Sequence, residues 1–487
     1  MTRYFIFLTG LLLTAVIFIT NYKPDTYLIG WDNLQTDLNP ILGIKRAFFG
    51  VWQEYQSFGL LGGLSHSADL IRAIFILILS FILPNHLVRF LFHNLMILVG
   101  FMGTARFCQD FNTSGKKNFT PILGGIFYIL NYGTIQILGL PWEAFSIFFA
   151  FLPWQIWIFL KILNQSSVSR KDLLLLFIIN LLATPQAYIQ TLFLSYFLIL
   201  IALWFGVFLK NFNTVFLKKS LEIFVVIISV NLFWILPQIY FLETSSYIVR
   251  EAKANVLSTD DLIYINKDKG DLLSFIKLEG FYNELRESNQ KLIFDVWRKH
   301  LQTFPMIISP FLLFGISILG FLFIKFRLTF FSVWLLIAFA LLSATPPFSL
   351  FHELLKQNNF LSQVFRSPFT KFIIPHAFFL SFFFSVGIDK IIEFFSKVKR
   401  FRLYFPLLIL SLIFITYFPA FSQNFFSPLT KVKIPGEYFS LFEYFKHQDK
   451  NKRIALLPDY TYWGWFAHNW GYNGSGFLWY GIEQPIV

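Results

Sequence analysis

The chain has 487 residues, of which 56% are hydrophobic and only 14% are charged, and its formal net charge is +13. Soluble domains carry about 25% charged residues, so this composition excludes an ordinary soluble protein and favours a protein that crosses a membrane many times. The single cysteine, Cys108, excludes an internal disulfide framework and a thiolate metal cluster. The basic residues form short clusters between apolar runs, which membrane orientation explains better than nucleic-acid binding does.

Apolar runs recur along most of the chain and predict an all-α polytopic protein with about eleven transmembrane helices. The first, 4–20, follows Arg3, and no small-residue cleavage site comes after it, so we expect an uncleaved anchor. The others are expected at 86–106, 120–137, 142–161, 171–183, 187–209, 219–241, 304–324, 328–344, 370–392 and 403–421.

The short apolar segment 69–83 decides the topology. If it lies at the membrane surface and does not cross, the clusters of lysine and arginine between spans fall on the side of Arg3, as the positive-inside rule requires. This predicts a multi-pass protein of the cytoplasmic membrane, with a cytoplasmic N-terminus and an extracytoplasmic C-terminus.

This topology divides the chain into a membrane domain, 1–422, and an extracytoplasmic segment, 423–487. The membrane domain has two long outer loops, 21–83 and 242–303. RIALLP (453–458) is typical of a strand, so the C-terminal segment is expected to be a small α/β or β unit, or the start of a larger soluble domain.

Two acids stand in the first outer loop, Asp32 and Asp37, followed by an amphipathic run over 41–55 that is typical of a helix on the membrane surface. A general base for glycosyl transfer to a membrane-anchored sugar would need a carboxylate at this depth. The alternative is structural, since either acid could cap the helix that follows.

Other outer-loop residues are candidates for substrate contacts. Glu143 begins a span, where a carboxylate can bind substrate or simply favour the helix dipole. Arg366 and Lys371 precede a span and suit a lipid phosphate, although basic residues also snorkel there. Further candidates for substrate binding are Trp52, His66 and Tyr132.

Several common chemistries have no motif in this sequence. It contains no P-loop, HExxH or GxSxG motif, and its eight histidines are dispersed, so we expect no metal site.

The order of short motifs resembles GT-C-fold membrane glycosyltransferases, in particular YfhO-like proteins and the large mycobacterial-type arabinofuranosyltransferases. Gly-x-Asp at 30–32 is followed by the surface helix, by Trp-x6-Gly-x-x-Gly-Gly at 52–63, and by a short apolar helix ending at Leu83-Pro84. YILNYG (128–133), LPWEAF (140–145), FRSPFTKF (365–372) and RIALLP follow in the same order. The resemblance covers nearly the whole chain.

The resemblance implies inverting transfer of a sugar from a polyprenyl-phosphate donor to a glycan, lipid or protein on the extracytoplasmic face. Asp32 would be the general base and Arg366 would hold the donor phosphate. The family acid directly follows glycine, whereas Trp31 intervenes here, so Asp37 remains an alternative. No metal or other cofactor is implied. The rival hypotheses are a transporter of lipids or lipid-linked sugars and a catalytically silent assembly protein of the same fold.

Overall fold

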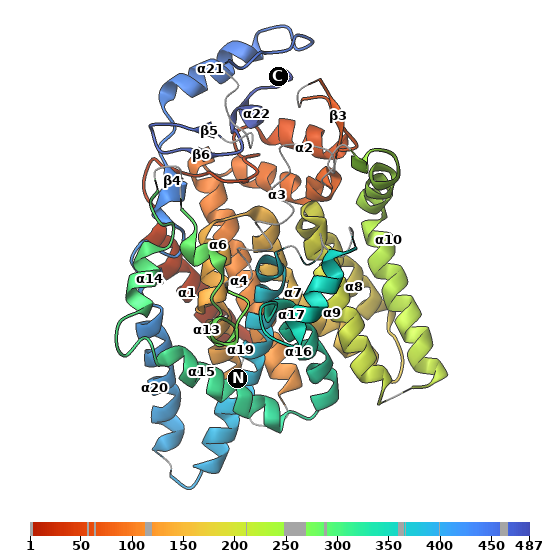
Figure 1. Cartoon of the computed structure of the whole chain (residues 1–487), viewed down its shortest axis with the longest axis vertical. Helices are drawn as coiled ribbons and strands as arrows, with labels where there is room; N and C mark the ends of the chain where they lie inside the picture. The colour runs from red at the N-terminus through yellow and green to blue at the C-terminus, as the bar shows by residue number, and fades with distance from the viewer. Residues whose placement is uncertain are drawn as a thin grey trace.

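The chain folds into a helical bundle with a cap of short elements at one end (Figure 1). The computed structural model describes residues 3–55, 58–62, 65–112, 119–210, 212–247, 269–286, 290–358, 365, 367–398, 400–457 and 466–487.

The helices of the bundle follow the predicted apolar runs closely. They are α1 (Arg3–Asn21), α4 (Asn85–Phe111), α5 (Thr120–Ile129), α6 (Tyr132–Gly139), α7 (Glu143–Asn164), α8 (Arg170–Ala183), α9 (Gln190–Phe208), α10 (Thr214–Thr244), α15 (Ser309–Phe323), α16 (Arg327–Leu341), α19 (Pro368–Phe394) and α20 (Phe401–Thr416).

Six of the described helices, α1, α4, α7, α9, α10 and α19, are long and apolar enough to cross a membrane. Helices α5 and α6 meet at an angle of 45° and together make a seventh candidate, where the sequence predicted one span over 120–137. Helices α8, α15, α16 and α20 are shorter, with 14 to 16 residues, but coincide with the four remaining predicted runs. The polytopic helical fold is therefore confirmed.

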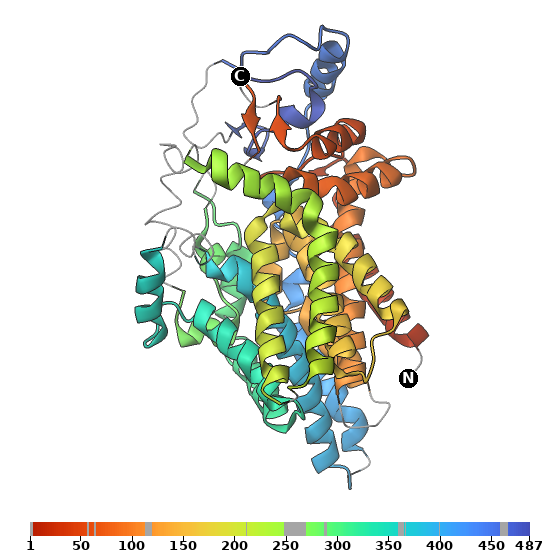
Figure 2. The ribbon, with the colours of Figure 1, turned by 90° about the vertical axis from the view of Figure 1, so that its right-hand side faces the viewer.

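Helix α19 forms the centre of the bundle. Its most apolar window is completely buried, in keeping with a sequence that is hydrophobic on every face. It crosses α15 at a close contact between two glycines, because a Cβ added to Gly320 would lie 1.7 Å from the carbonyl oxygen of Phe383 and one added to Gly387 would lie 2.1 Å from that of Ile316. Helix α10, by contrast, lies on the outside of the bundle and bends near the first loop, close to its internal Pro237 (Figure 2).

The first loop lies at one end of the bundle and contains only short elements: β1 (Tyr27–Leu28), α2 (Pro40–Phe48), β2 (Trp52–Gln53), β3 (Leu60–Leu61), the 3-10 helix η1 (His66–Asp69) and α3 (Leu70–Ser80). Helix α3 accounts for the short apolar segment and packs beside α2 (Figure 1).

The expected surface helix over 41–55 is too long. Helix α2 ends at Phe48, and Trp52 belongs to a two-stranded hairpin of β2 and β3. Its N-cap is Asn39, whose side chain accepts a hydrogen bond from the Leu42 amide at 3.1 Å. The hypothesis that Asp32 or Asp37 caps this helix is therefore wrong, because Asn39 satisfies the free amide.

The C-terminal segment packs on the first loop. After the 3-10 helix η5 (Phe418–Phe421), which ends the membrane domain, it contains the 3-10 helix η6 (Pro428–Thr430), β4 (Lys431–Val432), α21 (Gly436–Lys446), β5 (Phe466–Ala467), β6 (Asn473–Gly474) and α22 (Leu478–Gly481). Strand β4 pairs with β1, and Ile29 of the first loop shares a buried cluster with Val432 and Tyr472. In the described part of RIALLP only Ile454 makes a β-bridge, with Ile486, in place of the expected strand.

The remaining described elements connect these helices. They are the 3-10 helix η2 (Thr184–Tyr188), α13 (Leu272–Lys277), the 3-10 helix η4 (Phe281–Glu284), α14 (Asp295–Leu301) and α17 (Phe348–Lys356).

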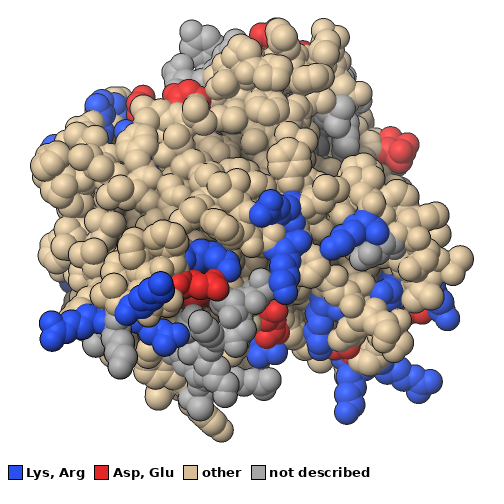
Figure 3. Space-filling model, turned by 90° about the horizontal axis from the view of Figure 1, so that it is seen from below, with Lys and Arg blue, Asp and Glu red and all other residues tan. Residues whose placement is uncertain are grey.

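The end of the bundle opposite the C-terminal segment is strongly basic. Figure 3 shows many lysine and arginine side chains on that face and few acidic ones. Exposed basic residues in or next to the connections between helices include Arg170, Lys171, Lys210, Lys325 and Arg400. Charge is therefore segregated to the end remote from the first loop.

Candidate active site on the first loop

Asp32 follows a turn with an unusual backbone. Gly30 has φ +124° and Trp31 has φ +56°, a left-handed conformation that a bulky residue rarely adopts. The C-terminal segment holds this turn: the Trp31 amide donates to the carbonyl of Asn473 at 2.7 Å, and the Ser475 amide donates to the carbonyl of Trp31 at 2.9 Å. Asp32 itself is exposed. The turn thus presents a carboxylate at the surface on a rigidly held backbone.

Aromatic side chains surround this position. The ring of Trp31 lies 6.4 Å from that of Trp142, Trp142 lies 6.2 Å from Tyr282, and Tyr282 lies 5.8 Å from Phe369 at the start of α19. Burial raises the pKa of Tyr282, and the negative charge of Asp32 raises it further. Asp32 therefore lies within electrostatic reach of η4, beside the N-terminal turn of α19.

Asp37 has a different environment. It is 1% exposed, and neither carboxylate oxygen has a hydrogen-bond partner among the described residues. Burial raises its pKa to about 6, and Glu143 adds to this, while Arg89 and Arg72 act in the opposite direction. A buried carboxyl of this kind is not placed to meet a large substrate.

Glu143 is the centre of a buried ion-pair cluster. Its carboxylate lies 2.8 Å from the Arg89 guanidinium of α4 and 3.9 Å from that of Arg72 of α3, and Arg72 also pairs with Asp69 at 2.6 Å. The Leu34 amide donates to the other Glu143 oxygen at 3.1 Å. Glu143 therefore ties the Asp32 loop to three helices.

The cluster partners Asp69, Arg72 and Arg89 did not emerge from the sequence as site residues. A usable signal was present, because charged side chains in apolar segments are rare and usually paired. Arg72 interrupts the apolar run 69–83, and Arg89 stands near the start of the span predicted at 86–106.

The other predicted contact residues lie apart from one another. Trp52 is exposed and its indole donates to Glu54 at 2.7 Å. The His66 ring lies 5.3 Å from that of Tyr188. Tyr132 is buried at the start of α6, where its hydroxyl donates to Asn283 at 2.6 Å and so fixes η4.

The predicted phosphate-binding residues fall at the start of α19. Lys371 is buried in its first turn, and its ammonium lies 3.4 Å from the carbonyl of Ser367; Arg366 lies outside the described residues. A cavity of about 330 Å³, open solvent included, flanks this turn and is lined by Lys269, Glu279 and Phe369 among others. In the described part of the chain, no three His, Cys, Asp or Glu side chains lie close enough together to hold a metal ion.

Known structures share this architecture, although no known protein family and no curated protein matches the sequence. The arabinofuranosyltransferase AftD from Mycobacteria aligns with a TM-score of 0.64 at 14% identity, over 100% of this chain and 32% of AftD. The archaeal oligosaccharyltransferase AglB from Archaeoglobus fulgidus, solved with an inhibitory peptide and a dolichol-phosphate, aligns with a TM-score of 0.50 at 12% identity, over 99% of this chain and 64% of AglB.

The chain has the GT-C fold. This confirms the predicted fold and the structural resemblance to an arabinofuranosyltransferase. The resemblance to YfhO-like proteins stays a prediction. At 12–14% identity the similarity concerns the fold, and the chain spans about a third of the length of AftD.

Proposed function

We propose that this protein is an integral membrane glycosyltransferase that transfers a sugar from a polyprenyl-phosphate donor with inversion, using Asp32 as general base. One observation carries the proposal: in a chain with the GT-C fold, Asp32 is an exposed first-loop carboxylate that directly follows the strained Gly30–Trp31 turn. In the reaction an acceptor hydroxyl oxygen attacks the anomeric carbon, its proton passes to Asp32, and the bond to phosphate breaks with its electrons leaving on the polyprenyl phosphate.

Accessibility favours Asp32 over Asp37 for this role. A general base must come within hydrogen-bond distance of the hydroxyl that it deprotonates. Asp37 is 1% exposed, whereas Asp32 is exposed and follows Trp31, whose ring lies 6.4 Å from that of Trp142. We assign Asp37 to the interior of the loop.

The donor phosphate would lie at the start of α19. The positive end of a long helix and a nearby ammonium both stabilise a leaving phosphate as its charge develops. Lys371 stands in the first turn, Lys269 lines the adjoining cavity, and Phe369 links that cavity to Tyr282. Arg366, one residue before Ser367, is the proposed additional cation.

Charge segregation supports an extracytoplasmic site. The basic face in Figure 3 lies at the end of the bundle remote from the first loop, and the positive-inside rule assigns such a face to the cytoplasm. The site would then face outward, where a lipid-linked donor and an acceptor can meet at the surface of the cytoplasmic membrane.

The distribution of buried charge favours an enzyme over a transporter. A transporter binds its substrate near the bilayer midplane, where charged side chains line the passage. Here Arg72, Arg89 and Glu143 lie at the loop end, in α3 and near the starts of α4 and α7. The buried charges Asp172, Lys219 and Asp389 lie near other helix ends, in α8, α10 and α19.

The decisive experiment is sugar transfer by the full chain in nanodiscs, with a panel of radiolabelled polyprenyl-phosphate sugars. We expect Asp32→Asn to lower transfer by about 10²-fold or more, the usual contribution of a general base, with donor binding retained. The matched control Asp37→Asn should keep most of the activity.

Loss of transfer in Asp37→Asn alone would move the base to that residue. Wild-type transfer by Asp32→Asn would disprove the assignment, and absence of any donor binding by the wild type would overturn the enzyme proposal itself.

A further inference from the structure

A cavity of about 420 Å³, open solvent included, lies beside the segment that carries Asp32, since Leu34 and Thr36 line it. The rest of its wall comes from α2, Tyr55 and η1 of the first loop, and from η2 and α22. The side chains that carry the argument are Arg46, Tyr55, His66, Asp69, Tyr188 and Tyr480.

The chemistry of this cavity suits a sugar. Aromatic rings pack on the C–H faces of sugar rings, and phenol, imidazole, guanidinium and carboxylate groups exchange hydrogen bonds with sugar hydroxyls. Neither the Tyr188 hydroxyl nor the Tyr480 hydroxyl makes a hydrogen bond to a described residue. Two donors are thus available to a ligand in the cavity.

Arg46 holds the walls together. Its guanidinium lies 4.0 Å over the Tyr55 ring and donates to the backbone carbonyls of Trp479 and, at 2.9 Å, Ile482. The first loop and α22 are therefore joined by one half-buried cation, and Tyr480 of α22 lines the same cavity as Tyr188. The cavity exists only because the C-terminal segment docks on the loop.

Tyr188 connects this cavity to Asp32. Burial is the main cause that raises the pKa of Tyr188. The phenols of Tyr480 and Tyr55 and the charges of Asp69 and Asp32 raise this pKa further. The charge of Asp32 thus acts on Tyr188 as well as on Tyr282, and Leu34, two residues after Asp32, lines the same cavity as Tyr188. An inverting base needs the acceptor hydroxyl beside it, with the leaving phosphate on the opposite face of the sugar.

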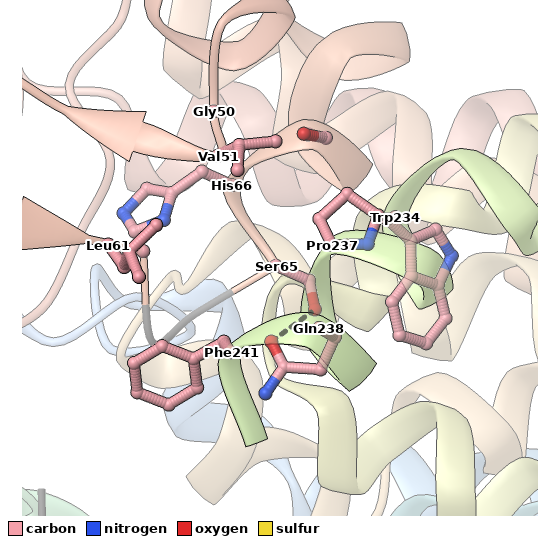
Figure 4. A pocket seen from close by; sticks show the side chains of 11 residues that line it. Gly50, Val51, Leu61, Ser65, His66, Trp234, Pro237, Gln238 and Phe241 are labelled. Atoms are coloured by element: carbon pink, nitrogen blue, oxygen red, sulfur yellow. Dashed lines mark hydrogen bonds between the residues drawn. The ribbon is translucent and has the colours of Figure 1, made fainter. Parts of the chain in front are cut away.

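A second cavity, of about 280 Å³ with open solvent included, shares His66 with the first (Figure 4). It lies between the first loop and the bent end of α10, and Trp234, Pro237 and Phe241 make its helical wall. Ser65 and Gln238 meet across it at 3.4 Å.

This second cavity adjoins the outer surface of α10. Leu236, Ile239 and Tyr240 of the same helix are 50–59% exposed, as expected of side chains that face lipid. An acyl or prenyl chain lying along this face of α10 would therefore pass the cavity wall formed by Trp234, Pro237 and Phe241.

We infer that the two cavities together bind a lipid-anchored saccharide acceptor, with its sugar among Tyr55, Tyr188 and Tyr480 and the lipid-proximal part beside Trp234. This rests on the proposed function and deepens it, since it selects a glycolipid over a free glycan or a protein as acceptor. The sugar hydroxyl that Asp32 deprotonates would belong to this ligand.

The test measures binding without any donor, so that it does not depend on turnover. The full chain in nanodiscs is titrated with methyl and hexadecyl glycosides that carry the same saccharide, over a panel of saccharides. For at least one saccharide we expect the hexadecyl glycoside to bind about tenfold more tightly or better, because its chain buries apolar surface.

Variants separate the two cavities. Trp234→Ala should remove most of the hexadecyl advantage and leave methyl glycoside affinity unchanged, whereas Tyr188→Phe and Tyr480→Phe should weaken both ligands about three- to tenfold. Leu236→Ala, a lipid-facing change on α10, is the matched control. If Trp234→Ala fails to fold, Val51→Phe narrows the same cavity from a partly exposed position.

Two results overturn the inference: no glycoside binds the wild type, or the cavity variants change neither affinity. If this happens while Asp32→Asn still abolishes transfer, the proposed function stands and the acceptor site lies elsewhere. If the glycosides bind through these residues but no donor is bound, the cavities bind glycolipid and the enzyme proposal fails.

Discussion

The burial of Asp37 predicts how the stability of the protein depends on pH. Its folded-state pKa of about 6 lies above its ordinary value of 3.8, so between these pH values the folded protein binds more protons than the unfolded chain. Stability should therefore fall as the pH rises from about 4 to 6, by up to about 3 kcal/mol from this group.

Asp37→Asn should flatten this part of the profile and raise the thermal midpoint at pH 7 relative to wild type. The measurement is the unfolding midpoint in nanodiscs from pH 4 to pH 7, with Asp32→Asn as control because that carboxyl is exposed. If the unfolding midpoint of Asp37→Asn falls with pH as steeply as that of the wild type, another group is responsible for the pH dependence.

At the scale of elements, the Gly30–Trp31 turn depends on β6. A Cβ on Gly474 would lie 2.6 Å from both the nitrogen and the oxygen of Trp31, so Gly474→Ala must displace the turn that carries Asp32. We expect transfer to drop about ten- to hundredfold, since small misplacements of catalytic groups have effects of this size.

Gly436→Ala is the control for this prediction. Gly436 stands in the same C-terminal segment, and an added Cβ there has no atom within 4 Å. Rates are compared at matched amounts of folded protein, and equal rates for the two variants would mean that the turn tolerates the shift.

The crossing of α15 and α19 gives a second prediction at this scale. Gly320→Ala places a methyl 1.7 Å from the Phe383 carbonyl, so the helices must separate and lose contacts along the crossing. We expect a destabilisation of about 1–3 kcal/mol or more, seen as a lower thermal midpoint. Gly315→Ala in the same helix meets no atom within 4 Å and should leave the midpoint unchanged or slightly raised.

At the scale of the whole molecule, the orientation can be tested by cysteine labelling. Cys108 is the chain's single cysteine and is buried, so labelling of the unmodified chain should be low. With the first loop extracytoplasmic, a membrane-impermeant maleimide added to intact cells should label Ser440→Cys in α21 and not Lys171→Cys at the start of α8. Permeabilised cells should label both, and the reverse pattern in intact cells would invert the topology.

The sequence by itself determined the framework. Each predicted span coincides with a helix or a bent helix pair. The reason is that hydrophobicity over about 20 residues is a local property, and it largely determines whether a segment can cross a bilayer. The short helix α3 could be predicted for the same reason. The motif order around Asp32 was enough to indicate the GT-C fold.

Other local patterns misled. The apolar spacing over 41–55 continued past Phe48, yet α2 stops there and the chain turns into the β2–β3 hairpin. RIALLP has strand composition, but its described partners are the last residues of the chain and not a sheet. The periodicity of a segment shows which secondary structure it can form. The part of the protein that it packs against determines which structure it does form.

Only the tertiary structure distinguished the two acids of the first loop. Asp32 and Asp37 are five positions apart and alike in sequence, but one is exposed on a turn fixed by Asn473 and Ser475, and the other is buried. Glu143, likewise, became an anchor only through its contact with Leu34, 109 residues away. Burial and pairing depend on contacts between distant parts of the chain, and no local window of sequence contains them.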